Sequence, residues 1–206
     1  MVFDYDGTLV ASRSGDEAAV AELVDADPGA AAGAGVFWQH DGEPLVTRIE
    51  AAWPGRTAEI LRLFERQAVP PFYPGIAPLL QGLDRAGLLL AVVSSRRLAP
   101  LEASLDATGL RRYFRVVVGL DDVRDPKPSP EGLLLALRRL GVDAPRAVFV
   151  GDNDLDVEAG RRAGVTVWRA IWGLPPPHPV PASANGTVLL RRPEEVSERL
   201  EGRTGH

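Results

Sequence analysis

Two groups of aspartates are spaced so that they could act together. Asp4 and Asp6 are two residues apart at the end of a short apolar run, so their side chains point to the same side of an extended chain. Asp152 and Asp156 follow another apolar run, 147–150. If both runs are neighbouring strands of one sheet, four carboxylates converge at one edge. Ionised carboxylates this close repel one another strongly unless a cation lies among them.

The residue types around these acids indicate which cation would fit. The chain has no cysteine, and its three histidines lie far from both groups in the sequence. Oxygen-only ligands favour Mg²⁺ over zinc or copper. The spacing of residues 152–156 also resembles the start of an EF-hand loop, but Val157 and Ala163 stand where that loop requires glycine and glutamate. We therefore expect a magnesium site.

Two further segments carry groups suited to an anion. Ser94 and Ser95 follow the apolar run 88–93 and precede a helical pattern, where a hydroxyl and free backbone N–H groups can hold phosphate oxygens. A serine pair at such a position is also a common helix cap. Lys127 is the single lysine among 23 basic residues, and the prolines on either side stiffen its loop. We therefore expect the loop to hold the Lys127 amine in a defined position.

The elements between these motifs repeat a β-α-β pattern from residue 75 onward. The apolar runs do not alternate with polar residues, as is typical of parallel strands covered on both faces. The predicted class is therefore α/β, a doubly wound, Rossmann-like parallel sheet. The predicted strands are 2–5, 88–93, 114–118, 147–150, 165–168 and 187–190, and the predicted helices are 75–86, 98–108, 130–140, 155–163 and one from about 193.

About 60 residues after the first strand do not keep this pattern. Amphipathic helices are predicted at 14–25 and 48–67, with the Gly/Ala-rich stretch 28–35 as a loop between them. We expect a small helical cap inserted at 12–72, and a catalytic core formed by 1–11 and 73–206. Insertions of this kind commonly act as lids. The proline-rich stretch 173–186 is expected to be an extended surface segment.

Composition limits the function classes. The net charge is −5 with 25% charged residues and no block of like charges, which argues against nucleic-acid and anionic-membrane partners and favours a small molecule. The longest apolar run is six residues, far below the roughly 20 that span a bilayer. An acid at position 4 is unlike a secretory signal, and the absence of cysteine fits a cytoplasmic setting.

The four motifs, taken together and in this order, resemble those of the haloacid dehalogenase superfamily. The sequence around these motifs is similar to that of the phosphoglycolate phosphatase-like branch, in which a helical cap follows the first strand. Only three residues precede Asp4, so the first strand is short or the sequence lacks its true start. The motifs are Asp4-Tyr5-Asp6-Gly7-Thr8, Ser94, Lys127 and Gly151-Asp152 with Asp156, flanked by Tyr73-Pro74-Gly75 and 159–164.

The resemblance implies a phosphatase that works through an aspartyl phosphate. Asp4 would attack phosphorus, and Asp6 would act as general acid and then general base. Mg²⁺ would be held by Asp4, the backbone carbonyl of Asp6 and Asp152, with Asp156 either binding the ion directly or supporting one of its ligands. Lys127 would be catalytic, holding Asp4 and a phosphoryl oxygen. The substrate-binding residues would be Thr8, Ser94, Ser95 and Lys127, although Ser95 stands where related phosphatases commonly have asparagine.

Other activities of the superfamily fit less well. Dehalogenases lack the second acid of the first motif, and phosphonoacetaldehyde hydrolases need a cap lysine, which 12–72 does not contain. A sugar phosphomutase resembling β-phosphoglucomutase remains open, as does a catalytically silent module that binds a phosphate ligand.

The substrate also remains open among phosphoglycolate, nucleoside monophosphates, sugar phosphates and pyrophosphate. Arg48 and Arg56 could meet a substrate carboxylate or second phosphate, although arginines on helix faces are usually solvated.

Overall fold

The computed structural model describes residues 1–67, 69–174 and 187–204. Within them, six parallel strands form one sheet in the order β3-β2-β1-β4-β5-β6, so the chain starts at the centre and winds outward in both directions. This confirms the predicted doubly wound α/β fold. The strands are β1 Val2–Phe3, β2 Ala91–Val93, β3 Val116–Val118, β4 Val148–Gly151, β5 Thr166–Ala170 and β6 Val188–Leu190.

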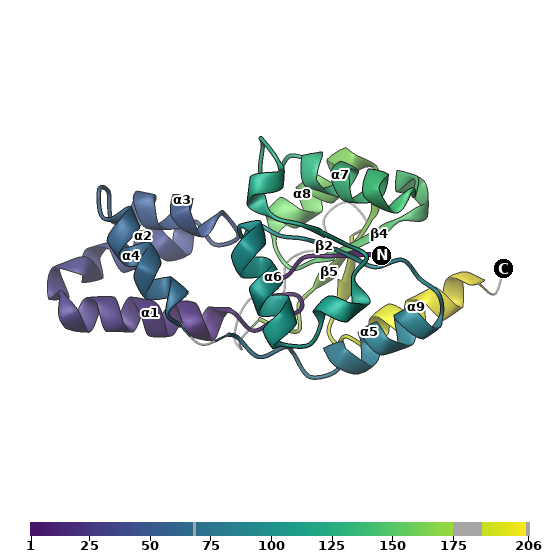
Figure 1. Cartoon of the computed structure of the whole chain (residues 1–206), viewed down its shortest axis with the longest axis horizontal. Helices are drawn as coiled ribbons and strands as arrows, with labels where there is room; N and C mark the ends of the chain where they lie inside the picture. Colours follow the sequence, from purple (N-terminus) through teal and green to yellow (C-terminus); the bar gives the residue numbers. More distant parts are fainter. Residues whose placement is uncertain (68, 175–186, 205–206) are drawn as a thin grey trace.

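Helices cover both faces of this sheet, as Figure 1 shows. One face packs against α5 (Ile76–Arg85), α6 (Leu98–Ala107) and α9 (Glu195–Thr204), and the other against α7 (Glu131–Leu140) and α8 (Asp154–Ala163). Successive strand residues serve opposite faces: Val2 packs with the α7–α8 side and Phe3 with the α5–α6 side. Both faces of the sheet are buried, which explains why each strand is a continuous run of apolar residues.

The helix ends follow from local sequence. Gly141 and Gly164 end α7 and α8 in the left-handed conformation, with φ of 68° and 71°. Short 3₁₀ turns occupy Pro28–Ala30, Arg111–Tyr113, Leu120–Asp122 and Ala144–Arg146. The positions predicted for the core helices and strands are confirmed to within a few residues, except that β1, β2 and β3 are shorter than expected.

Among the described residues between β1 and α5 there are four α-helices: α1 (Arg13–Ala26), α2 (Ala31–Gln39), α3 (Leu45–Ala52) and α4 (Thr57–Glu65). We call residues 12–72 the helical insert. Its helices gather at one end of the molecule in Figure 1 and share a hydrophobic cluster of their own, which includes Phe37, Ile49, Trp53 and Ile60. A separate apolar centre is consistent with the predicted cap, whose boundaries stay a prediction.

Two predictions within the insert are wrong. The stretch 28–35 is not a loop, because α2 begins at Ala31; alanine is the best helix former, and Gly33 is needed for packing. A Cβ at Gly33 would lie 2.4 Å from the carbonyl oxygen of Ala52. The helix predicted at 48–67 is two helices, because Pro54 has no backbone N–H and Gly55 turns the chain at φ 78°.

The two chain segments that join the insert to the sheet lie side by side. Val10 pairs with Phe72 in an antiparallel bridge, and the N–H groups of Ala11 and Tyr73 donate to the carbonyls of Pro71 and Leu9 at 2.9 and 3.0 Å. The chain therefore enters and leaves the insert at one place.

The predicted extended segment 173–186 falls mostly outside the described residues. None of the helices in the described part of the chain has both the length and the hydrophobicity that a bilayer span requires.

Candidate active site

The centre of the sheet brings three of the four predicted acids together, Asp4, Asp152 and Asp156, whereas the Asp6 carboxylate pairs with Arg96. Val2 and Phe3 of β1 pair with Phe149 and Val150 of β4, and the Asp4 N–H donates to the Val150 carbonyl at 2.8 Å. Both strands end there, so Asp4 and Asp152 leave the sheet at the same edge. Carboxylate oxygens of Asp4, Asp152 and Asp156 lie within 4.8 Å of one another.

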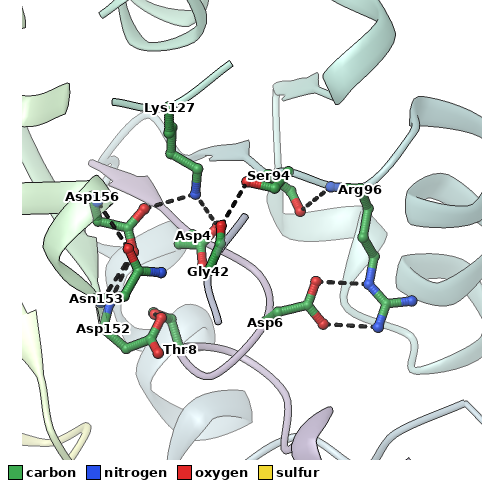
Figure 2. A network of polar contacts seen from close by, with 11 residues as sticks. Asp4, Asp6, Thr8, Gly42, Ser94, Arg96, Lys127, Asp152, Asn153 and Asp156 are labelled. Carbon is green, nitrogen blue, oxygen red and sulfur yellow. Dashed lines mark hydrogen bonds and ion pairs between the residues drawn. The ribbon is translucent and has the colours of Figure 1, made fainter. Parts of the chain in front are cut away.

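Lys127 lies inside this cluster (Figure 2). Its Nζ donates to Oδ1 of Asp4 and to Oδ1 of Asp156, both at 2.7 Å, and the three side chains are almost fully buried. Burial opposes the charge on the amine, but the carboxylates of Asp156 and Asp4 outweigh it and raise the pKa of Lys127. The predicted proximity of Lys127 and Asp4 is thus present in the structure.

One lysine does not balance three carboxylates. Burial, and next the charge of Asp156, raises the pKa of Asp4 to about 7. Burial and the charges of Asp156 and Asp4 raise the pKa of Asp152 well above its ordinary value. A further cation among these oxygens would remove the repulsion, and the donor set is the all-oxygen one that Mg²⁺ prefers. The residues present therefore fit Mg²⁺.

Asp156 is held in place by the start of α8. Asn153 and Asp156 form a reciprocal cap: the Asp156 N–H donates to Oδ1 of Asn153 at 3.0 Å, and Oδ2 of Asp156 accepts from the N–H of Asp152 at 3.1 Å and of Asn153 at 3.4 Å. Its other oxygen stays free to accept from Lys127. The Asn153-to-Asp156 spacing could have revealed this cap in the sequence.

The predicted hydroxyl residues also border the cluster. The Thr8 hydroxyl, on a buried residue, donates to Oδ1 of Asp152 at 3.3 Å. Oγ of Ser94 accepts from the Arg96 N–H at 3.1 Å, and the Ser95 hydroxyl donates to the Gly42 carbonyl of the helical insert at 3.4 Å. Thr8, Ser94 and Ser95 therefore lie at the same sheet edge as the acid cluster, with Ser95 contacting the insert.

Asp6 has a partner that the sequence analysis missed. Nε and one terminal nitrogen of Arg96 donate to its two carboxylate oxygens at 2.7 and 2.8 Å, a bidentate pair visible to one side of the acid cluster in Figure 2. Burial would raise the pKa of Asp6, but the charge and hydrogen bonds of Arg96, together with a hydrogen bond from Ser12, outweigh burial and lower it. In the sequence, the only indication of this pairing is that an arginine directly follows Ser94-Ser95.

A cavity of about 570 Å³ opens above these groups and extends to the helical insert. Asp4, Asp6 and Lys127 line its core side. Arg13, Asp16, Trp38, Asp41 and Arg48 line the insert side. This volume is within the range of pockets that enclose small-molecule ligands.

Comparison with known proteins identifies the family. The sequence model of the haloacid dehalogenase-like hydrolases matches residues 40–170, which include Ser94, Lys127 and Asp152 and follow Asp4 and Asp6. The chain therefore belongs to the haloacid dehalogenase-like hydrolases, an enzyme family. The predicted resemblance is confirmed.

Its relatives carry the names of phosphatases. The chain is 36% identical over 129 residues to N-acetylmuramic acid 6-phosphate phosphatase of Pseudomonas aeruginosa, covering 63% of this chain and 57% of that protein. It is 31% identical to phosphoglycolate phosphatase 1 of the same organism, covering 92% and 75%. The crystal structure of CbbY from Rhodobacter sphaeroides in complex with phosphate superposes with a TM-score of 0.74 at 28% identity, covering 95% and 94%.

Proposed function

We propose that this protein is a Mg²⁺-dependent phosphatase that hydrolyses a small-molecule phosphate monoester through an aspartyl phosphate on Asp4. One observation carries the proposal: Lys127 holds Asp4 at 2.7 Å in a buried cluster with Asp152 and Asp156, at the edge of a ligand-sized cavity. The phosphatase names of the relatives support it, and so does the phosphate complex of the structural neighbour.

In the first step an oxygen of Asp4 forms a bond to phosphorus while the bond from phosphorus to the leaving oxygen breaks. Lys127 neutralises part of the charge that gathers on the phosphoryl group and fixes the second oxygen of Asp4. The Ser94 hydroxyl and the backbone N–H of Ser95 hold the remaining phosphoryl oxygens, whereas the Ser94 N–H donates to the Val118 carbonyl at 3.0 Å. Asp4, Asp152 and Asp156, with the Asp6 carbonyl, would hold Mg²⁺, which would supply further charge stabilisation.

Asp6 moves the protons. It donates a proton to the leaving alcohol in the first step and takes one from the water that attacks the aspartyl phosphate in the second. The second step breaks the bond from Asp4 to phosphorus and releases inorganic phosphate. Because the pairing with Arg96 keeps Asp6 ionised, Arg96 has to release it before Asp6 can act as the acid.

The first test is phosphate release from a panel of esters, with Mg²⁺ and then with EDTA. The panel contains p-nitrophenyl phosphate, phosphoglycolate, nucleoside monophosphates and sugar phosphates. We expect release with Mg²⁺ and none with EDTA. Isomerised sugar phosphate without released phosphate would indicate a phosphomutase instead.

The nucleophile is tested by substitution. Asp4→Asn should lower turnover of every ester by about 10⁴-fold or more, because an amide cannot attack phosphorus. Asp84→Asn removes an exposed aspartate of α5 and serves as the matched control. Equal turnover in Asp4→Asn and Asp84→Asn would remove the assignment of Asp4.

A further inference from the structure

Arg48 is a buried cation whose hydrogen bonds are incomplete. The residue is 7% exposed and lines the cavity from α3. One terminal nitrogen donates to Asp16 at 2.9 Å, whereas Nε and the other terminal nitrogen have no hydrogen-bond partner. The guanidinium carbon lies over the Phe37 ring, 3.9 Å from its centre. Buried donors without partners are costly, so a further acceptor is expected at this edge of the guanidinium.

The group nearest this edge is another carboxylate of the insert. Oδ1 of Asp41 lies 3.5 Å from the second terminal nitrogen of Arg48, too far for a good hydrogen bond. Oδ2 of Asp41 accepts from Arg13 at 3.3 Å. The Asp41 carboxylate thus lies between two arginines, and the guanidinium carbons of both are within 5.5 Å of the centre of the Trp38 ring.

Asp41 is held loosely in this position. Its side chain is 54% exposed, and it lies on the turn that joins α2 to α3, where Gly42 has φ 88°. Exposed ion pairs of this kind contribute little to stability, so Asp41 can leave for solvent without disturbing the insert. Arg48 is fixed by contrast, because Asp16 and Phe37 hold it.

We propose that Arg13 and Arg48, beside Trp38, form a binding site for an oxyanion, and that the Asp41 carboxylate occupies this site until a ligand displaces it. The inference rests on the proposed function: the ligand is a phosphate ester whose leaving group carries a second oxyanion, either a carboxylate or a phosphate. The phosphoryl group to be transferred would lie at Asp4, and the second anion would lie at Arg48, on the opposite wall of the same cavity.

Kinetics with matched substrate pairs test the specificity. 2-Phosphoglycolate against ethyl phosphate tests the carboxylate, and a hexose 1,6-bisphosphate against the hexose 6-phosphate tests the phosphate. Asp41→Asn should lower KM for the doubly anionic member of one pair by about three- to tenfold, because the competing carboxylate is gone, and leave the singly anionic member unchanged. Arg48→Gln should raise KM for the same member by about tenfold or more, with kcat little changed.

The matched control is Glu43→Gln, which removes one negative charge from the same turn at a residue paired with His40. It should leave the ratio of KM values within each pair unchanged. If Asp41→Asn also leaves both ratios unchanged, the proposal is wrong, whereas hydrolysis of p-nitrophenyl phosphate would still support the proposed function. Asp41→Asn carries the test if Arg48→Gln fails to fold, because Asp41 is exposed.

Binding can be measured without turnover. Acetate carries the same carboxylate group as Asp41, and the proposed site adjoins the Trp38 ring. Acetate should therefore quench tryptophan fluorescence more in Asp41→Asn, where the site is vacated, than in the unaltered chain. Arg48→Gln or Trp38→Phe in the same background should remove the difference. Quenching by acetate that only equals quenching by chloride would overturn the oxyanion site whether or not the protein hydrolyses any ester.

Discussion

At the scale of single residues, the acid cluster couples protonation to stability. The pKa of Asp4 is raised from 3.8 to about 7 in the folded chain. Between about pH 4 and pH 7 the unfolded chain has lost this proton and the folded chain still keeps it. The metal-free protein should therefore lose stability as the pH rises through this window, and the raised pKa of Asp152 acts in the same direction.

Magnesium should reverse this loss. At pH 8 Asp4 is ionised and free to bind the ion, whereas at pH 5 protons compete for it. At a Mg²⁺ concentration of about 100 times Kd, binding stabilises by about 2.7 kcal/mol, or roughly 5–10 °C for a chain of this size. Thermal unfolding at pH 8 should show this increase in Tm, and unfolding at pH 5 a much smaller one.

Asp152→Asn supplies the control for this prediction. It removes one repelling carboxylate, so the metal-free variant should be less sensitive to pH and its Tm should respond little to Mg²⁺. An increase in Tm at pH 8 as large as that of the unaltered chain would show that the ion binds elsewhere.

At the scale of elements, the turn after β1 leaves no room for a side chain. Gly7 has φ 74°, and a Cβ there would lie 2.4 Å from Oδ2 of Asp152. The turn that presents Asp6 and Thr8 therefore depends on glycine for two separate reasons, its backbone conformation and the closeness of the acid.

Gly87 allows these two reasons to be separated. It has φ 75°, and a Cβ there would meet nothing within 4 Å. Gly87→Ala and Gly7→Ala should each cost about 1–2 kcal/mol of stability from the left-handed conformation. Only Gly7→Ala should also displace Asp152 and lower Mg²⁺ affinity and turnover by at least tenfold. Chemical denaturation and Mg²⁺ titration measure the two effects, and equal turnover in both variants would contradict the clash.

The sequence predicts the elements of the core better than those of the insert. Strands with continuous apolar residues and helices ended by glycine are local signals, so the sheet and the convergence of Asp4 with Asp152 follow from them. The prediction at α2 is wrong because a glycine is required at position 33 by close packing against Ala52, a contact between residues distant in the sequence. The pairing of Asp6 with Arg96 joins residues 90 positions apart and has no local signature.

At the scale of the whole molecule, the cavity is shared by the sheet edge and the helical insert, and the two connecting segments lie side by side. The Ser95 hydroxyl contacts the insert through a hydrogen bond to the Gly42 carbonyl at 3.4 Å. We therefore expect the insert to move as a unit about residues 10–11 and 71–72, and to close when a ligand lies between both walls.

Distance measurements between spin labels test this movement. The chain has no cysteine, so Asp25→Cys on α1 and Arg138→Cys on α7 provide two unique, exposed attachment sites. Mg²⁺ with inorganic phosphate should narrow their distance distribution. A pair within the insert, Asp25→Cys with Ala58→Cys, should keep its distribution. Identical distributions with and without phosphate for the first pair would show that the insert does not close.

The presence of a single lysine has a practical consequence for spectroscopy. All other basic side chains except the histidines are arginines, and the one lysine lies between Asp4 and Asp156. An isotope label introduced through lysine would therefore give a nuclear magnetic resonance spectrum with one side-chain ammonium signal, already assigned. Its chemical shift would test the proposed binding of Mg²⁺ and the proposed phosphorylation of Asp4 in the intact enzyme, without a mutation or an attached probe.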